Sequence, residues 1–140
     1  MSEEQRKVVK VRVRRGRGRP PGYMWTVQVL DVAHREGLAF LTDTQHRHMR
    51  NQVKELARQR DPAHSETIDV RQIEDFYEIR DKGGVLAKLN VRVFFFVHQD
   101  RQEIVVLSVI NKKNDGKTKI ADRIRARNRM RRYLSSTNSG

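Results

Sequence analysis

The first third of the chain alternates apolar and polar positions and then changes to helical spacing. Residues 23–31 (YMWTVQVLD) alternate and are rich in β-branched side chains, which predicts a strand. A short helix is expected over 33–41, and a second one follows with Asp43 as its N-cap. This second helix should end near Asp61-Pro62, because the residue before a proline avoids helical geometry. Its apolar positions recur at i, i+4 and i+7, and they are Met49, Val53 and Leu56.

The second half of the chain predicts three strands and a closing helix. The strands are expected at about 73–80, 89–98 and 103–110, with short connections that carry turn residues. A basic helix from about Lys119 to Leu134 should close the domain. The predicted fold class is therefore α+β, with an N-terminal strand, two helices, a three-strand antiparallel meander and a C-terminal basic helix.

The central strand of this meander has two different faces. Its odd positions, 89–97, are all apolar, so the two preceding helices are expected to cover that face. The even positions place Arg92 among phenylalanines, and alternation on the preceding strand puts Glu78 and Arg80 on one side. Arg92 then either forms an ion pair with Glu78 or contacts a ligand.

Charge and composition narrow the class of partner. The net charge is +13 in 140 residues, and it is concentrated in residues 6–19 and 112–132, while the rest of the chain is slightly acidic. Such fields attract polyanions, and nucleic acid is favoured over a membrane, because the closing helix has only a thin apolar face. There is no cysteine, which excludes disulfides and thiolate chemistry, and no run of signal-peptide or membrane-spanning length. We expect a cytoplasmic protein with a flexible basic arm (1–22), one domain (23–134) and a disordered tail (135–140).

The last strand ends in an unusual way. Seven apolar or small residues, 104–110, are followed by Asn111 and then by two adjacent lysines, Lys112 and Lys113. These lysines form either a solvated turn or the rim of an anion site beside Arg80 and Arg92. Strand alternation sends them to opposite sides, and the register that would decide between them is not readable from the sequence.

The order of these motifs resembles the RelE/ParE superfamily of bacterial type II toxins, and in particular its HigB-like branch. The similar features are an aromatic-Glu-apolar-Arg strand (77–80), an Arg-apolar-aromatic-aromatic strand (91–95) and an apolar strand that leads to Lys112-Lys113. The resemblance covers about Trp25 to Leu134. The residues after the lysine pair, 114–116, and the arginine-rich closing helix depart from the usual pattern of that branch.

The resemblance implies metal-independent cleavage of messenger RNA, usually on the ribosome, and inhibition by a cognate antitoxin; no cofactor is expected. It assigns Arg80, Arg92, Lys112 and Lys113 to the phosphate and the transition state. The physical chemistry agrees, because RNA supplies its own 2′-OH nucleophile and needs only alignment, charge neutralisation and proton transfer. Cations beside a lysine also lower its pKa.

Further residues complete the set of candidates. His98 and Tyr133 are the conventional acid/base candidates, each weighed against an ordinary packing role. The pair His46-x-His48 points apart on a helix and makes a metal site improbable. The expected RNA-binding cations lie on the turns and on the closing helix, and they are Lys82, Lys88, Lys117, Lys119, Arg123 and Arg127.

The basic arm leaves other functions open. Arg17-Gly18-Arg19-Pro20 resembles the core of an AT-hook, which lays arginines in the minor groove of A·T-rich DNA. The alternatives to an endoribonuclease toxin are therefore a non-catalytic nucleic-acid-binding protein with a toxin-like fold, in which this arm binds DNA, and a ParE-like inhibitor of DNA gyrase.

Overall fold

The computed structural model describes residues 13–14, 19, 21–113 and 116–138. Within them, six strands form one sheet in the order β1-β2-β6-β5-β4-β3, in which β2 and β6 are parallel and all other neighbours are antiparallel. The strands are β1 (Val13–Arg14), β2 (Thr26–Leu30), β3 (Val70–Gln72), β4 (Tyr77–Lys82), β5 (Asn90–His98) and β6 (Glu103–Asn111). The α-helices are α2 (Asp31–Leu38), α3 (Asp43–Ala57) and α4 (Ile120–Asn138).

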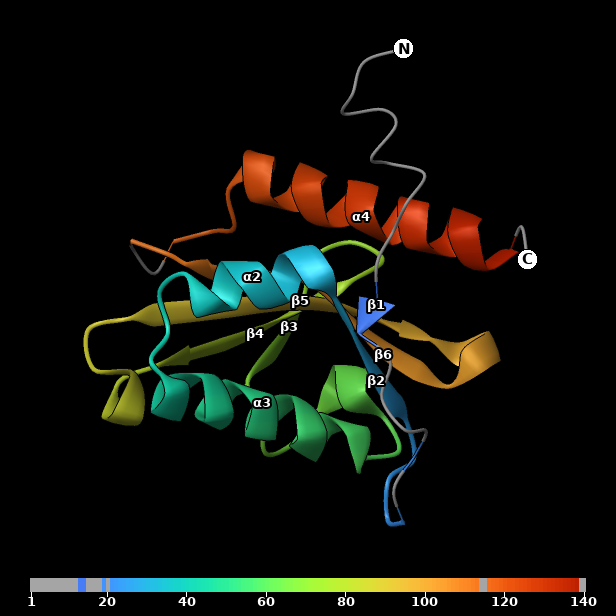
Figure 1. The fold of residues 1–140 in the computed structure, drawn as a ribbon, viewed down its shortest axis with the longest axis horizontal. Helices are drawn as coiled ribbons and strands as arrows, with labels where there is room; N and C mark the ends of the chain where they lie inside the picture. The colour runs from blue at the N-terminus through green and yellow to red at the C-terminus, as the bar shows by residue number, and fades with distance from the viewer. Residues whose placement is uncertain (1–12, 15–18, 20, 114–115, 139–140) are drawn as a thin grey trace.

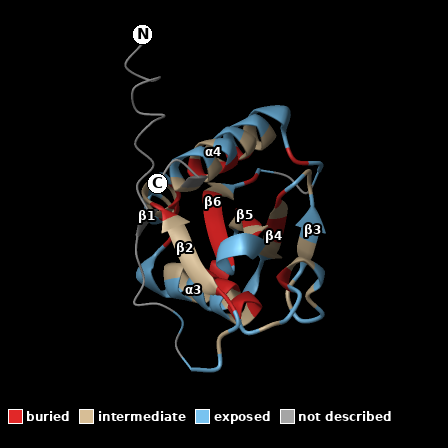
Figure 2. Cartoon of the chain, turned by 90° about the vertical axis from the view of Figure 1, so that its right-hand side faces the viewer, coloured by how far each residue is buried: buried red, intermediate tan, exposed pale blue. Residues whose placement is uncertain are grey.

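The sheet lies between helices on its two faces. Figure 1 shows α4 on one side of the sheet and α3 on the other, with α2 between them. Figure 2 shows that the most buried strand residues belong to the middle of this sandwich, in β5 and β6. The α+β prediction is confirmed, including the meander β4–β5–β6. No helix in the described part of the chain is both long and apolar enough to cross a membrane.

The two faces of the sheet follow the alternation of β5. We call one the α3 face; it carries Val93, and α2 and α3 cover it, as predicted. We call the other the α4 face; it carries Arg92, Phe94 and Phe96, and Phe96 packs edge-on against Tyr133 of α4. The core is therefore divided by the sheet into two layers.

Several element boundaries differ from the prediction. The N-cap of α3 is Thr42 and not Asp43: the Thr42 side chain accepts a hydrogen bond from the Gln45 backbone, and the Gln45 side chain accepts one in return. The first meander strand begins at Tyr77 rather than at 73, and β3 pairs with its outer edge. Within the segment expected to be a flexible arm, Val13–Arg14 pair with β2, and most of that segment lies outside the described residues.

A β-bulge interrupts the pairing of β5 with β6. Phe94 lies opposite Ser108, but Phe95 lies opposite Val106, so that Leu107 is an extra residue in β6. The backbone there is satisfied from the helices: Glu36 of α2 accepts from the Val109 amide, and Arg129 of α4 donates to the Leu107 carbonyl. The extra residue reverses the faces of everything that follows it in β6.

Candidate functional site

Two arginines meet over one buried carboxylate on the α4 face. Arg80 and Arg92 lie directly opposite each other on β4 and β5, where like charges would destabilise the pair. Glu78 relieves this repulsion, because its Oε1 accepts from Arg80 Nε at 2.6 Å and from Arg92 Nη1 at 3.1 Å. The Thr118 hydroxyl, just before α4, contacts both oxygens of the same carboxylate at 3.0 and 3.1 Å. The ion pair between Arg92 and Glu78, left open by the sequence, is thus present.

The two arginines differ in what they can reach. The side chain of Arg92 is only 2 % exposed, whereas that of Arg80 is 23 % exposed. Both line a cleft of about 500 Å³ at this end of the sheet, together with Asp69, Arg71, Asp81, Lys82 and Asn90. Arg92 therefore belongs to the floor of the cleft, and Arg80 has the more accessible guanidinium group.

The bulge in β6 decides which lysine joins these arginines. Ile110 lies opposite Arg92, and the Lys112 amide donates to the Asn90 carbonyl, so Lys112 lies on the arginine face. Lys112 is 5 % exposed and its Nζ donates to the Gly116 carbonyl at 2.7 Å. Burial is the main cause of a lowered pKa at Lys112, and the positive charge of Arg92 lowers this pKa further. Lys113 is exposed and is not among the residues that line the cleft.

His98 and Tyr133 do not join the cleft. His98 lies six residues beyond Arg92 on β5, a separation of about 20 Å at the rise of a strand. Its ring packs beside Tyr133, whose hydroxyl donates to the buried Glu103 at 2.8 Å. Burial and this hydrogen bond raise the pKa of Tyr133 well above its ordinary value. The two form a separate cluster at the other end of the sheet.

The expected RNA-binding cations fall into two groups. Lys82, Lys88, Lys117 and Lys119 are exposed, and Lys82 lines the cleft. Arg123 and Arg127 instead form ion pairs with Glu74, and the fork from Arg127 is the closer, at 2.6 and 2.7 Å. This contact holds the pKa of Glu74 below its ordinary value.

The remaining sequence candidates are dispersed. Arg17 lies outside the described residues, and Arg19 donates to the Met24 carbonyl and the Gln102 side chain, which ties it to the domain. His48 contacts Asp81 at 2.7 Å, whereas His46 packs edge-on against His34 of α2. The two histidines therefore do not converge on one ligand position, as their spacing predicted.

Sequence reasoning missed two parts of the site. It did not include β3, whose Arg71 and neighbouring Asp69 form one wall of the cleft. It also did not find Thr118, which ties the segment before α4 to Glu78. Asp69 and Arg71 lie at a three-residue edge strand, which is too short to show a pattern in the sequence. Thr118 lies 40 residues from Glu78, and no sequence pattern indicates this contact.

Comparison with known proteins identifies the family. The family model described as "Phage derived protein Gp49-like (DUF891)" matches residues 36–131, which is more than half of the chain. The chain belongs to the Gp49-like family. Gp49-like proteins are toxin-like, of the RelE/HigB type found in toxin–antitoxin systems, and membership implies a cognate antitoxin as partner. No curated protein is similar enough in sequence to match this one.

Proposed function

We propose that this Gp49-like protein is an endoribonuclease toxin that cleaves messenger RNA on the ribosome. The observation that carries the proposal is the cluster of charged side chains around Arg80 and Arg92 at the cleft. Two guanidinium groups share one carboxylate oxygen, and a lysine lies beside them. Arg80, Arg92 and Glu78 together carry one positive charge, and Lys112 adds a second in its protonated form. A phosphate group is an anion suited to this field.

The reaction needs little beyond these groups. The 2′-OH of one nucleotide attacks the adjacent phosphorus, the bond to the 5′ oxygen breaks, and a cyclic phosphate and a 5′-hydroxyl are formed. One proton leaves the 2′-OH and one reaches the departing oxygen. In this scheme Arg80 contacts the phosphoryl oxygens directly, and Arg92 contributes charge from the floor of the cleft.

The two lysines divide the remaining work. The lowered pKa of Lys112 brings its amine closer to neutrality, which suits a group that takes up or gives a proton. Lys113, which is exposed, holds the backbone of the strand that enters. The exposed Lys82, Lys88, Lys117 and Lys119 extend the positive surface along the RNA.

The test is cleavage of messenger RNA in a translation extract by Lys112→Ala, Lys113→Ala and Arg92→Ala, with folding checked by thermal melting. Loss of one transition-state contact reduces a rate by roughly 10²–10³. Lys54→Ala, an exposed lysine on the other side of the sheet, is the matched control. If all three variants are folded and cleave at the parental rate, the proposal is wrong.

One observation favours a second candidate, a nucleic-acid-binding protein that does not cleave. Arg92 forms an ion pair with the buried Glu78, which is also what a purely structural arginine would have. In that case RNA oligonucleotides bind in the cleft but stay intact, and no end with a cyclic phosphate is formed. Mass analysis of the RNA termini after incubation separates the two candidates.

A further inference from the structure

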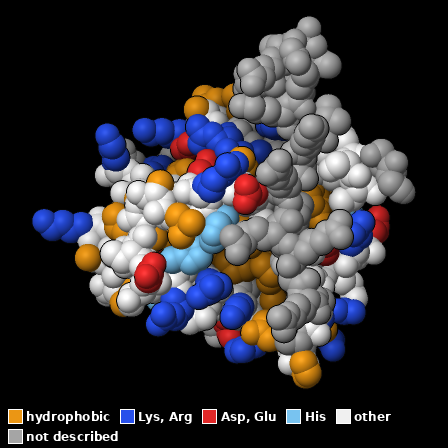
Figure 3. Space-filling model, viewed as in Figure 1, with side chains coloured by type: hydrophobic (Ala, Val, Ile, Leu, Met, Phe, Trp, Pro, Cys, Tyr) orange, Lys and Arg blue, Asp and Glu red, His pale blue; other side chains and the backbone are white. Residues whose placement is uncertain are grey.

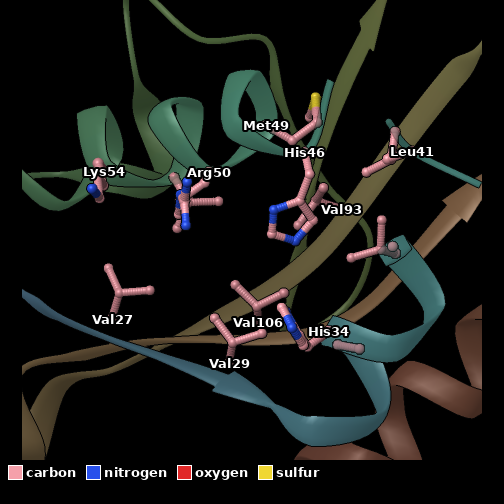
Figure 4. Close-up of a pocket in the computed structure, with 14 residues that line it drawn as sticks. Val27, Val29, His34, Leu41, His46, Met49, Arg50, Lys54, Val93 and Val106 are labelled. Carbon is pink, nitrogen blue, oxygen red and sulfur yellow. The ribbon is translucent and has the colours of Figure 1, made fainter. Parts of the chain in front are cut away.

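A hydrophobic cavity of about 230 Å³ lies on the α3 face, on the opposite side of the sheet from the arginine cleft. Figure 4 shows Val27, Val29 and Val106 forming its base, with α3 above them. His34 of α2 and His46 of α3 come into it from the helices. In the described residues that line it there is no Asp or Glu.

The size of this cavity points to a side chain as its occupant. The pocket lies between two helices and a sheet and is open to solvent on one side, so a side chain from outside the domain can enter it. A cavity of about 150 Å³ is enough for benzene, whereas pockets for drug-sized ligands start at about 300 Å³. A leucine or phenylalanine side chain therefore fits, and most small-molecule ligands do not.

The surroundings of the cavity are positively charged. Arg47, Arg50 and Lys54 are exposed on α3 at spacings of three and four residues, which places them on one face of the helix along about 10 Å. None of the ion pairs within the described part of the chain uses these three cations. Figure 3 shows histidine side chains at the surface between α2 and α3, with Lys and Arg side chains over α3 beside them. We name Arg47, Arg50 and Lys54 together the α3 cation stripe.

We propose that this cavity binds one bulky apolar side chain of an acidic segment from a protein partner. The carboxylates on either side of that anchor would pair with the α3 cation stripe, because charge complementarity then extends along the segment. A nucleic acid matches the stripe but not the cavity, since the polar edges of a base would lose their hydrogen bonds among valines. The antitoxin implied by the family is a protein that would supply such a segment.

This interface does not depend on the proposed ribonuclease activity. The cavity and the cleft lie on opposite faces of the sheet, so that a segment in the cavity and an RNA in the cleft do not occupy the same space. Failure of the cleavage experiment therefore leaves this proposal untouched, and the reverse also holds.

The test uses fluorescein-labelled peptides of 15 residues that are rich in Glu and carry one central leucine. A second peptide has alanine in place of the leucine, and a third has lysine in place of every glutamate. Fluorescence anisotropy measures the affinity of each for the full chain. We expect the leucine peptide to bind at least tenfold more tightly than the alanine peptide, and the lysine peptide not to bind.

Variants assign the binding to the cavity and the stripe. Arg50→Glu/Lys54→Glu should weaken the binding of the leucine peptide by tenfold or more. Arg131 is an exposed cation on α4, and Arg131→Glu should change the affinity for this peptide by less than twofold. Val27→Trp, which fills the cavity from β2, should abolish the preference for leucine over alanine. Thermal melting checks that each variant is folded.

Several outcomes would overturn the proposal. Equal binding of the leucine and alanine peptides would show that the cavity is not used. If Arg50→Glu/Lys54→Glu weakens the binding of a short RNA as much as the binding of the peptide, the α3 cation stripe is a nucleic-acid contact. Tight binding of free 4-methylpentanoate, a leucine-like carboxylate, would assign the cavity to a small molecule instead.

Discussion

Replacing Glu78 by glutamine removes one negative charge and leaves the shape of the side chain unchanged. The carboxylate is fully buried and contacts Arg80, Arg92 and Thr118. In Glu78→Gln the two guanidinium groups face each other across β4 and β5 without the carboxylate, and Arg92 is almost fully buried. The substitution should therefore destabilise the fold strongly.

The magnitude follows from burial. Removing one partner of a buried ion pair costs about 3–5 kcal/mol, because the other charge stays in a medium of low dielectric constant. Water reaches Arg80, so we take the lower end, about 3 kcal/mol. In a domain of this size that corresponds to a fall in Tm of about 10 °C. Adding Arg92→Met to Glu78→Gln should recover part of this loss, since the buried charge is then gone.

Thermal melting of the purified variants at pH 7 checks this prediction. Glu55→Gln is the matched control, because Glu55 forms an exposed ion pair with Arg58 on α3, and it should melt within about 2 °C of the parent. If Glu78→Gln also melts within that margin, or if the double variant is less stable than Glu78→Gln alone, the account of Glu78 as the group that holds the two arginines is wrong.

Three further predictions concern other parts of the chain. Deleting residues 1–21 should weaken binding to any nucleic acid and flatten its salt dependence, because up to eight phosphate contacts are lost; a salt titration of a labelled RNA measures this. Gly37→Ala should raise the free energy of unfolding by about 0.5–1 kcal/mol in a urea titration, because alanine favours the helix and its Cβ would lie at ordinary contact distance, 3.6 Å from Leu41 and 3.7 Å from Val109; a lower stability would show that these neighbours do not accommodate the Cβ. Glu74 has a lowered pKa through Arg127, so its contribution is complete above its ordinary pKa of 4.5 and is lost as pH falls through the lowered value. Glu74→Gln should therefore lower Tm at pH 7, and this loss should shrink as the pH is lowered below 4.5; a loss that is the same at every pH would contradict the ion pair.

The strands and helices of the domain were largely predictable, because each has a clear apolar period. The alternation of residues 89–98 indicated both the central strand and its two faces, and these positions form β5. The N-cap was missed by one residue, since Thr42 and Asp43 are both good caps and only the reciprocal contact with Gln45 distinguishes them. β3 was missed because three residues at an edge are too few to show a period.

The candidate site was predictable in its residue types but not in its geometry. Alternation placed Arg80 and Arg92 on one face, which the register of β4 and β5 confirms. It could not show that Arg92 lies on the floor and Arg80 nearer to solvent, because burial depends on the helix packed above. The choice between Lys112 and Lys113 depended on one extra residue in β6, and no composition rule marks Leu107 as that residue.

The bulge at Leu107 separates the position of a residue in the sequence from its position in space. Deleting that single residue would remove the bulge and leave the later pairs unchanged, because Ser108 would follow Val106 directly and still lie opposite Phe94. Lys112 would stay on the arginine face, and Val109 would stay on the α3 face. A residue lost between Ser108 and Lys112 would instead move Lys113 to the position of Lys112. Relatives of this chain should thus be aligned by the number of residues between the bulge and the lysine pair, and a relative that is one residue shorter in that interval has the same letters and a different site.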